Sequence, residues 1–298
     1  MANIQWDKKM KTAIVLICII IVAISSKTYA QGNSWNEVEK IIGKNGNVQG
    51  NVLKITFPRT DLNVKVKDVK IEPALALTPW LAFYKMGDET MIMGDLVLLL
   101  DEVPNVIKTV VENGLEITAI HNHILNETPQ IIYMHVGGSG EPLELAKKIK
   151  SVLNQTKIPI QTAKPVTNKP DYDWTNVQNV IGVKGQINGN VLQFSIPRSE
   201  PITENGMEIP TYMGVTTTFN IQLVKEKSIA TGDFIVMADE VNSVIKALNE
   251  NNITVTALHS HMLKESPRLF FLHFWGSDTP MNIAKGLKEG LNKTKSKL

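Results

Sequence analysis

The chain has 298 residues, of which 43% are hydrophobic and 20% are charged. This composition at this length indicates a folded protein of two domains, and it excludes a disordered, a collagen-like or a polytopic membrane protein. Basic and acidic side chains number 31 and 29, and the first thirty residues hold four of the basic ones against a single aspartate. The rest of the chain is therefore slightly acidic, so we do not expect a nucleic-acid partner.

Residues 1–30 have the pattern of an export signal. A cluster of lysines precedes an uncharged apolar run of about fourteen residues, which is shorter than the roughly twenty that a bilayer span needs. Small residues, Thr28 and Ala30, then stand three and one positions before a cut at Gln31. We predict a cleaved signal peptide and a secreted or extracytoplasmic protein, with an uncleaved membrane anchor as the alternative. Cleavage would remove Cys18, the only cysteine, and with it any disulfide or thiolate site.

The remainder of the chain is an internal duplication. Between residues 94–136 and 232–274, which are 138 positions apart, 18 of 43 residues are identical. We predict a first repeat domain at residues 31–153 and a second at residues 173–298, which form a pseudo-dimer of internal repeats. The segment between them, residues 154–172, contains three prolines and little apolar periodicity, so we expect an extended linker.

Hydrophobic periodicity predicts the same elements in both copies. In chain order, the first copy is expected to hold a helix at 35–42, strands at 51–58, 75–85 and 90–100, a helix from an N-cap at Asp101 to about Asn113, strands at 116–123 and 130–136, and a helix opened by Glu141 and Pro142. This order predicts an α+β fold, a tandem duplication of a domain with an antiparallel sheet and helices packed on one face.

All six histidines fall at matching positions of the two copies, in the pattern H-x-H-x11-H. They are His121, His123 and His135 in the first copy and His259, His261 and His273 in the second. Two histidines at i and i+2 on a strand project from one face, and imidazole nitrogens are common ligands of zinc and similar divalent metals. We predict all six as metal ligands. The alternative is a set of structural histidines that are hydrogen-bonded at a sheet edge.

The third histidine of each copy reaches the others only in one strand register. In a tight hairpin His135 lies on the opposite face, whereas a shift that pairs residue 121 with residue 133 brings it to the same face, about 8 Å from His121. The loop between these strands offers a competing third ligand, Glu127 in the first copy and Glu265 in the second. In an enzyme these two glutamates are the candidate catalytic bases.

Arginine usage gives a second candidate site. The sequence has only three arginines, and Arg59 and Arg198 occupy the same Pro-Arg position of the two copies. A planar guanidinium at both positions fits bidentate binding of an anionic ligand or cofactor. It equally fits a structural pair with a buried carboxylate, for which Asp95 and Glu102 and their counterparts are the candidates.

The segments TAIHNHI and TALHSHM, each followed by Glu-x-Pro and a further histidine, resemble the LppY/LpqO family of secreted or lipid-anchored bacterial proteins. The resemblance covers nearly the whole chain after residue 30 as two copies of the family domain. It implies a bacterial source and export, and it brings no established activity. Ile17 precedes Cys18 where a lipoprotein signal needs a small residue, which argues against a lipid anchor.

Two functional hypotheses follow. In the first, the protein is a metal-dependent hydrolase that acts in the cell envelope, where the ion activates water. In the second, it is a non-catalytic module that binds a metal, a cell-wall component or a small anionic ligand. An open site with a carboxylate in reach favours the hydrolase, and a closed site favours the binding module.

Overall fold

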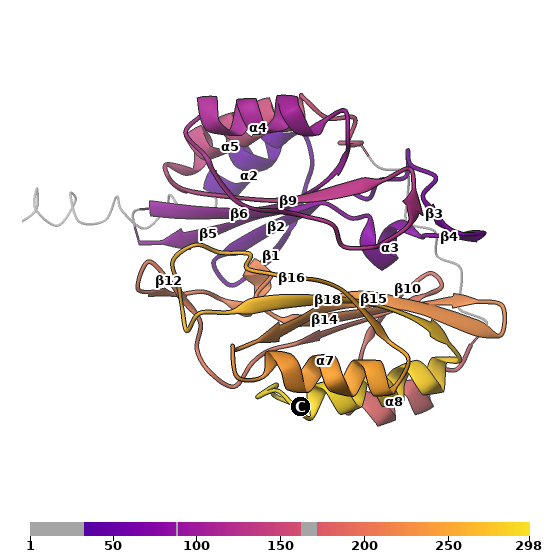
Figure 1. The fold of residues 1–298 in the computed structure, drawn as a ribbon. Helices are drawn as coiled ribbons and strands as arrows, with labels where there is room; N and C mark the ends of the chain where they lie inside the picture. The colour runs from indigo at the N-terminus through magenta and orange to yellow at the C-terminus, as the bar shows by residue number, and fades with distance from the viewer. Residues whose placement is uncertain (1–32, 88, 162–171) are drawn as a thin grey trace, which may run out of the picture.

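A computed structural model describes residues 33–87, 89–161 and 172–298. The predicted signal peptide and most of the predicted linker lie outside the described residues. Each copy folds as a six-stranded antiparallel sheet with helices on one face, which confirms the predicted α+β duplication. The two sheets face each other and the helices lie outside them, so the molecule has four layers: helices, sheet, sheet, helices (Figure 1).

The first copy has the strand order β1-β2-β5-β6-β9-β7. Its elements, in chain order, are α2 (Asn33–Ile42), β1 (Asn47–Gln49), β2 (Val52–Thr56), β3 (Lys65–Val66), β4 (Val69–Lys70), α3 (Pro73–Ala76), β5 (Trp80–Met86), β6 (Glu89–Leu99), α4 (Val103–Glu112), β7 (Glu116–His121), β8 (Glu127–Thr128), β9 (Ile131–Gly140) and α5 (Pro142–Leu153). A small sheet of order β4-β3-β8 stands beside the main one.

The second copy repeats this order as β10-β11-β14-β15-β18-β16. Its elements are α6 (Thr175–Ile181), β10 (Gln186–Asn188), β11 (Val191–Ile196), β12 (Thr203–Glu204), β13 (Met207–Glu208), the 3-10 helix η1 (Thr211–Met213), β14 (Thr217–Val224), β15 (Lys227–Val236), α7 (Val241–Glu250), β16 (Thr254–His259), β17 (Glu265–Ser266), β18 (Phe270–Asp278) and α8 (Pro280–Leu291). No helix among the described residues is long and apolar enough to cross a membrane.

Both faces of each sheet are buried, and strand β6 shows how. Ile92, Leu96 and Leu98 point to the helices and join the core of the first copy. Met91 and Val97 point the other way and join apolar clusters that contain residues of both copies. Because side chains alternate along a strand, burial on both faces explains why β6 has a continuous apolar sequence instead of an alternating one.

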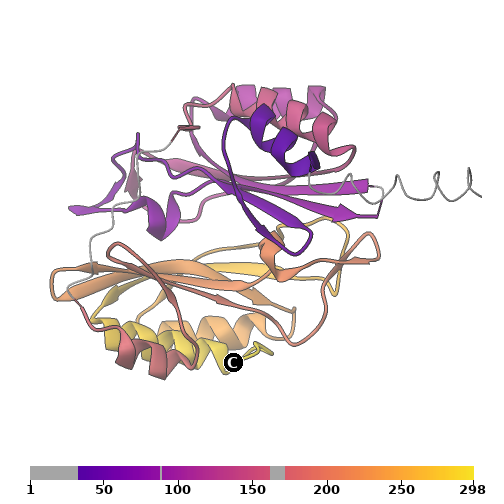
Figure 2. The same cartoon turned by 180° about the vertical axis from the view of Figure 1, so that it is seen from behind.

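The two copies pack against each other through reciprocal arms. Helix α3 of the first copy contacts β11, β14 and β15 of the second, and η1 of the second copy contacts β2 and β5 of the first (Figure 2). Side-chain amides of the second sheet fix the first arm: Gln193 donates to the carbonyl of Ala74 at 2.7 Å, and Asn220 donates to that of Leu75 at 2.7 Å. The pseudo-dimer is therefore a face-to-face assembly within one chain.

Two predicted boundaries were wrong. The strand expected at 75–85 begins at Trp80, because the residues before it form the short helix α3, which opens with Pro73 at its first position. The N-cap of α4 is Glu102 and not Asp101. The carboxylate of Glu102 is buried and accepts a hydrogen bond from the backbone of Leu99, whereas Asp101 is exposed.

Candidate metal centre

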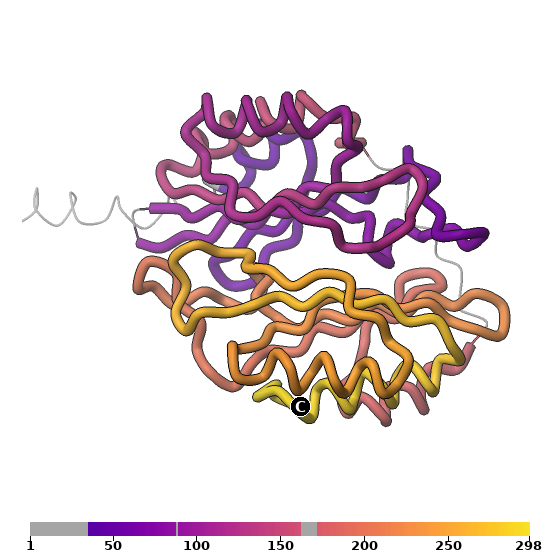
Figure 3. The backbone as a smooth tube through the Cα atoms, in the orientation of Figure 1, coloured from indigo at the N-terminus to yellow at the C-terminus, as the bar shows by residue number. Residues whose placement is uncertain are grey.

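The six histidines gather between the two sheets, where the edge strands β7 and β16 approach each other. In Figure 3 the backbone of each copy forms one half of the molecule, and the two halves face each other along their sheets. His121 and His259 end these two strands, and their rings stack with centroids 3.7 Å apart. The rings of His121 and His135 are 5.2 Å apart, and those of His135 and His261 are 3.7 Å apart. Both copies therefore contribute to one cluster.

Strand register decides that the third histidine of each copy joins the cluster. In the first copy, His121 lies opposite Tyr133 and Ala119 lies opposite His135, after an irregularity between Ile117 and Ala119. The sequence left two registers open, and the structure has the shifted one. Strands β16 and β18 repeat it in the second copy. All three histidines of a copy therefore face the other sheet.

Two aspartates stand in the same cluster, and the sequence analysis did not predict them as ligands. Asp95 of β6 lies opposite His135, and Asp233 of β15 lies opposite His273. Each follows a glycine in the middle of an apolar strand, at matching positions of the repeat. A charged residue retained in both copies at the centre of a buried strand is the signal that could have revealed them.

Two groups of side chains have the spacing of metal ligands. In the first, nitrogen atoms of His121, His259, His261 and His273 all lie within 4.8 Å of one another, and the Nε2 atoms of His259 and His273 are 2.7 Å apart, so without a metal these two imidazoles share a hydrogen bond. Four imidazole nitrogens this close can surround one ion in a tetrahedral arrangement.

The second group adds a carboxylate. His123, Asp233 and His273 offer ligand atoms within 4.8 Å of one another. Oδ1 of Asp233 contacts Nδ1 of His273 and lies 3.4 Å from Nε2 of His123. His273 belongs to both groups, so the two are parts of one centre. Two imidazoles and one carboxylate form a common ligand set for transition metals.

Five imidazoles of the centre have lowered pKa values, which favours their neutral form. Burial, followed by the charge repulsion of neighbouring imidazoles, lowers the pKa of His135 to about 3 and that of His259 to about 4. The same two causes lower the pKa of His121, His123 and His261. A metal binds the neutral form of imidazole, so these histidines need no deprotonation before they can act as ligands near neutral pH.

The two aspartates differ in charge. Burial alone would raise the pKa of Asp233, but the imidazoles of His273 and His123 hold it well below its usual range. Burial and the charge of Asp233 raise the pKa of Asp95 well above its usual range, against the opposing effect of Lys54. The charged form is therefore favoured at Asp233 and the neutral form at Asp95.

Several buried side-chain atoms lack hydrogen-bond partners among the described residues, two of them in the first ligand group and two, on His135 and Asp95, outside both groups. They are Nε2 of His121, Nε2 of His135, Nε2 of His261 and Oδ1 of Asp95, all buried. The Nε2 atom of His135 is 3.7 Å from Oδ1 of Asp95, which is too long for a hydrogen bond. An unsatisfied buried polar atom costs about 1–3 kcal/mol. An ion between these atoms would satisfy them, so the donor set fits a metal.

The two loop glutamates lie apart from both ligand groups. Oε1 of Glu127 accepts a hydrogen bond from the backbone of Ile131 at 3.1 Å. In the second copy, Oε1 of Glu265 accepts one from the backbone of Leu269 at 3.1 Å. These bonds close the loops that connect β7 to β9 and β16 to β18, so the carboxylates organise the loop backbone.

The two matching arginines each bind a carboxylate. Arg59 is fully buried, and its Nη1 donates to the carbonyl of Val97 at 2.7 Å and to Glu102 at 3.2 Å. Arg198 repeats the arrangement with Glu240, at 2.7 Å. The sequence offered Asp95 and Glu102 as partners, and the structure shows Glu102. The guanidinium groups connect each sheet to the helix that follows it.

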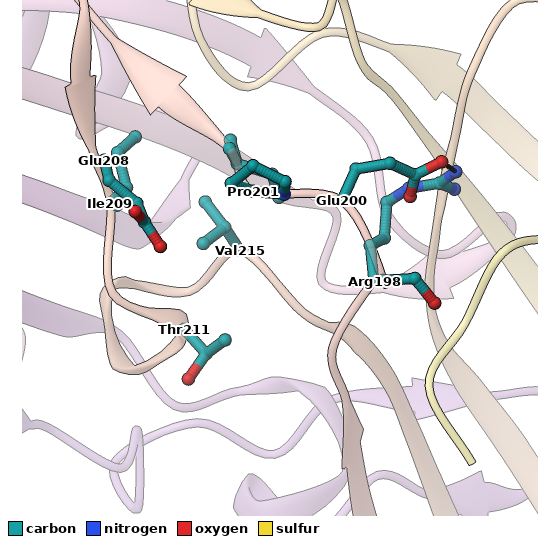
Figure 4. Close-up of a pocket in the computed structure, with 9 residues that line it drawn as sticks. Arg198, Glu200, Pro201, Glu208, Ile209, Thr211 and Val215 are labelled. Carbon is teal, nitrogen blue, oxygen red and sulfur yellow. Dashed lines mark hydrogen bonds and ion pairs between the residues drawn. The ribbon is translucent and has the colours of Figure 1, made fainter.

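Neither arginine is available to an anionic ligand. Arg198 lines a pocket of about 230 Å³ together with Glu200, Ile209 and Val215 (Figure 4). Its Nε donates to Glu200 at 3.2 Å, and Glu240 takes the other side of the guanidinium. The pocket thus holds an arginine that is already neutralised by two carboxylates.

The comparisons with known proteins place the chain in a family. The family model "Domain of Unknown Function (DUF1259)" matches residues 36–155 and again residues 175–293. The chain belongs to this family. It carries two copies of the family domain, in agreement with the internal repeat. None of the curated proteins matches the chain.

Three solved structures are weakly similar, two of them described as microcompartment shell proteins. The trimeric shell protein MSM0271 from the RMM microcompartment is 10% identical, with 70% of this chain and 84% of that chain covered and a TM-score of 0.21. The trimeric shell protein PduB is 10% identical, with coverage of 83% and 88% and a TM-score of 0.20. EtuB from Clostridium kluyveri is 9% identical, with coverage of 83% and 90% and a TM-score of 0.19. Similarity at these TM-scores carries no argument about function.

Proposed function

We propose that this DUF1259 protein binds a divalent transition-metal ion, zinc or a similar ion, in the centre between its two copies. The six histidines supply the imidazole ligands, and Asp233 supplies a carboxylate. The observation that carries the proposal is the group of four imidazoles, two buried and two half-buried, whose nitrogens lie within 4.8 Å of one another. Lowered histidine pKa values and buried atoms without partners support it.

The geometry favours a binding centre over a hydrolase. Metal-dependent hydrolysis needs a general base that can reach a bound water. The two glutamates predicted for that role accept hydrogen bonds from their own loops. The carboxylate that does belong to a ligand group, Asp233, contacts two imidazoles. We therefore propose a non-catalytic metal-binding module.

We further propose that the protein is exported and belongs to the LppY/LpqO group of bacterial proteins. The support is the signal-like sequence of residues 1–30 and the duplicated histidine segments. A centre in an exported protein without cysteine in its body would bind metal through imidazole and carboxylate groups and not through thiolates, which keeps it independent of the redox state of the compartment.

The test compares metal binding by the wild type and by His121→Ala combined with His259→Ala. A metal that binds the native state alone stabilises it by about 2.7 kcal/mol at a hundredfold excess over Kd. We expect zinc, nickel or manganese to shift the thermal melt of the wild type, and the double variant to lose this shift. The matched control is Asn122→Ala combined with Ser260→Ala, which changes the residue next to each histidine and should keep the shift.

The opposite pattern would reject the proposal. If none of the three metals stabilises the wild type while the histidine variant is clearly weakened without metal, the histidines are structural hydrogen-bonding groups. Elemental analysis of the purified wild type gives an independent measurement, with bound transition metal near one equivalent per chain as the expected result.

A further inference from the structure

A row of side chains on β6 leads along one face of the strand to Asp95 in the centre. Met91, Met93 and Asp95 alternate along the strand, so they project from the same face, about 7 Å apart at successive positions. Met91 lies in the apolar cluster shared by the two copies, with Met93 packed against it. The row therefore places two thioethers in line with a carboxyl group of the metal centre.

The matching row of the second copy lacks sulfur. Counted by the repeat offset, its residues are Ile229, Thr231 and Asp233. The aspartate is the same in both copies, and only the two positions that lead to it differ. The methionines are thus a feature of one side of the centre.

A pocket of about 250 Å³ lies at this side and reaches His261. Its walls come from both copies, with Met91 and Met93 on the first and His261 and Met262 on the second. The first copy has Ile124 at the position that matches Met262. His261 is 8% exposed, and its Nε2 has no hydrogen-bond partner in the described part of the chain. Three thioether side chains and an unsatisfied imidazole therefore line one cavity.

The charges of the pocket suit a cation. Lys264 pairs with Glu116 at 3.3 Å, which neutralises its ammonium. The remaining charged residue of the lining is Glu204, whose buried Oε2 has no hydrogen-bond partner among the residues described. The pocket does not suit an anion, because its lining has this carboxyl group and no unpaired basic side chain.

We propose that this pocket is a separate site for a soft monovalent cation, Cu(I), held by the thioethers of Met91, Met93 and Met262 with the imidazole of His261. Thioether ligands select Cu(I) over the harder divalent ions, which prefer imidazole and carboxylate. Cys18 is the only cysteine and lies far outside this segment, so methionine is the sulfur ligand that the pocket offers. The proposal goes beyond divalent binding at the centre and shares only His261 with it.

The experiment measures Cu(I) affinity of the full chain in a Cys18→Ser background, without oxygen and in competition with a chromophoric Cu(I) chelator. Met91→Leu combined with Met93→Leu keeps side-chain volume, and we expect it to weaken Cu(I) binding at least tenfold. The matched control is Met213→Leu combined with Met237→Leu, since both residues pack in the same apolar cluster but do not line the pocket. The control should bind Cu(I) as the wild type does.

X-ray absorption of the Cu(I)-loaded protein supplies the second measurement. We expect sulfur scatterers in the wild type and their loss in the Met91/Met93 variant, whose zinc-dependent thermal shift should be unchanged. Equal Cu(I) affinity in the two proteins, or a wild-type spectrum with nitrogen and oxygen alone, would overturn the thioether site. If Cu(I) binding depends on the methionines while no divalent ion binds, this inference stands and the divalent centre fails.

Discussion

His123 and His261 occupy matching positions of the two copies, yet their surroundings differ. Nδ1 of His123 lies 3.2 Å from Oγ1 of Thr231, and the carbonyl of His123 accepts a hydrogen bond from Thr256 at 2.8 Å. In the half that contains His261, Met93 stands at the position that matches Thr231, and a pocket lies beside the His261 imidazole. We call the half with His123 the closed half, because hydrogen bonds fix that histidine, and the half with His261 the open half, because a pocket lies beside it; the two histidines are equally buried.

The difference shows how a duplicated site can be divided between two tasks. Both copies keep the three histidines and the aspartate at matching positions of the sequence. The neighbours of the ligands differ, and they decide which histidine is fixed and which is open. A histidine that hydrogen bonds already fix loses little side-chain entropy when it binds a metal. A histidine that lies beside a pocket gives an ion a path of entry.

Separating the copies should have the largest effect. Residues 34–153 and 171–298, each produced alone, expose the apolar clusters that the two copies share, so we expect each to be insoluble or unfolded. Produced together, the fragments should associate and regain metal binding, as size-exclusion chromatography and a zinc titration would show. A soluble, folded fragment with its own thermal transition would contradict this expectation.

Replacing each aspartate by asparagine should sharpen the comparison, because only Asp233 has a pKa that favours the charged form. Asp233→Asn takes the charge away from His123 and His273, and we expect zinc affinity to fall at least tenfold by titration calorimetry. Asp95→Asn is the matched control for the metal-free protein. Because burial and Asp233 raise the pKa of Asp95, its carboxyl group is already neutral, and the free energy of unfolding should change by less than about 1 kcal/mol. If Asp95→Asn lowered zinc affinity as much as Asp233→Asn does, the two halves of the centre would be equivalent.

Lowering the pH should weaken the metal-free protein. The pKa of His135 is about 3 and that of His259 is about 4 in the folded chain, against about 6.5 when unfolded. Between pH 6.5 and these lower values the unfolded chain binds protons that the folded chain does not, so the free energy of unfolding falls as pH falls. Urea unfolding at pH 7.5, 6 and 5 measures the slope, and His259→Gln should reduce it. A flat profile would mean that the folded and unfolded chains take up protons equally, so that the fold does not lower the pKa of these imidazoles.

Breaking the hydrogen bond of the closed half should have the smallest effect. Thr231→Val removes the hydroxyl beside His123 and should destabilise the metal-free protein by about 1 kcal/mol, the usual value of one hydrogen bond. Met93→Leu, at the matching position of the open half, should change stability less, because it alters no hydrogen bond and little volume. Chemical denaturation of the two variants compares them directly, and a larger loss from Met93→Leu would reverse the assignment of the two halves.

Much of the fold could be predicted from the sequence, because periodicity and duplication are local patterns. The register of β7 on β9 could not, since both registers keep apolar residues inside and only the irregularity near Ile117 distinguishes them. Asp95 and Asp233 were missed as ligands because their contacts come from β9 and β18, strands that lie far along the chain. The short helix α3 was taken for a strand because its residues are apolar throughout and pack between the sheets.

The face-to-face packing of the copies has a consequence for how the centre assembles. Two identical chains would have to meet before a shared cluster of histidines existed, and dilution would take it apart. A covalent connection makes that meeting intramolecular, at an effective concentration in the millimolar range for short linkers. A symmetric homodimer must also repeat any change on both sides of its axis. When both copies lie in one chain, each can change by itself. One chain can therefore carry a threonine, Thr231, on one side of the centre and a methionine, Met93, on the other.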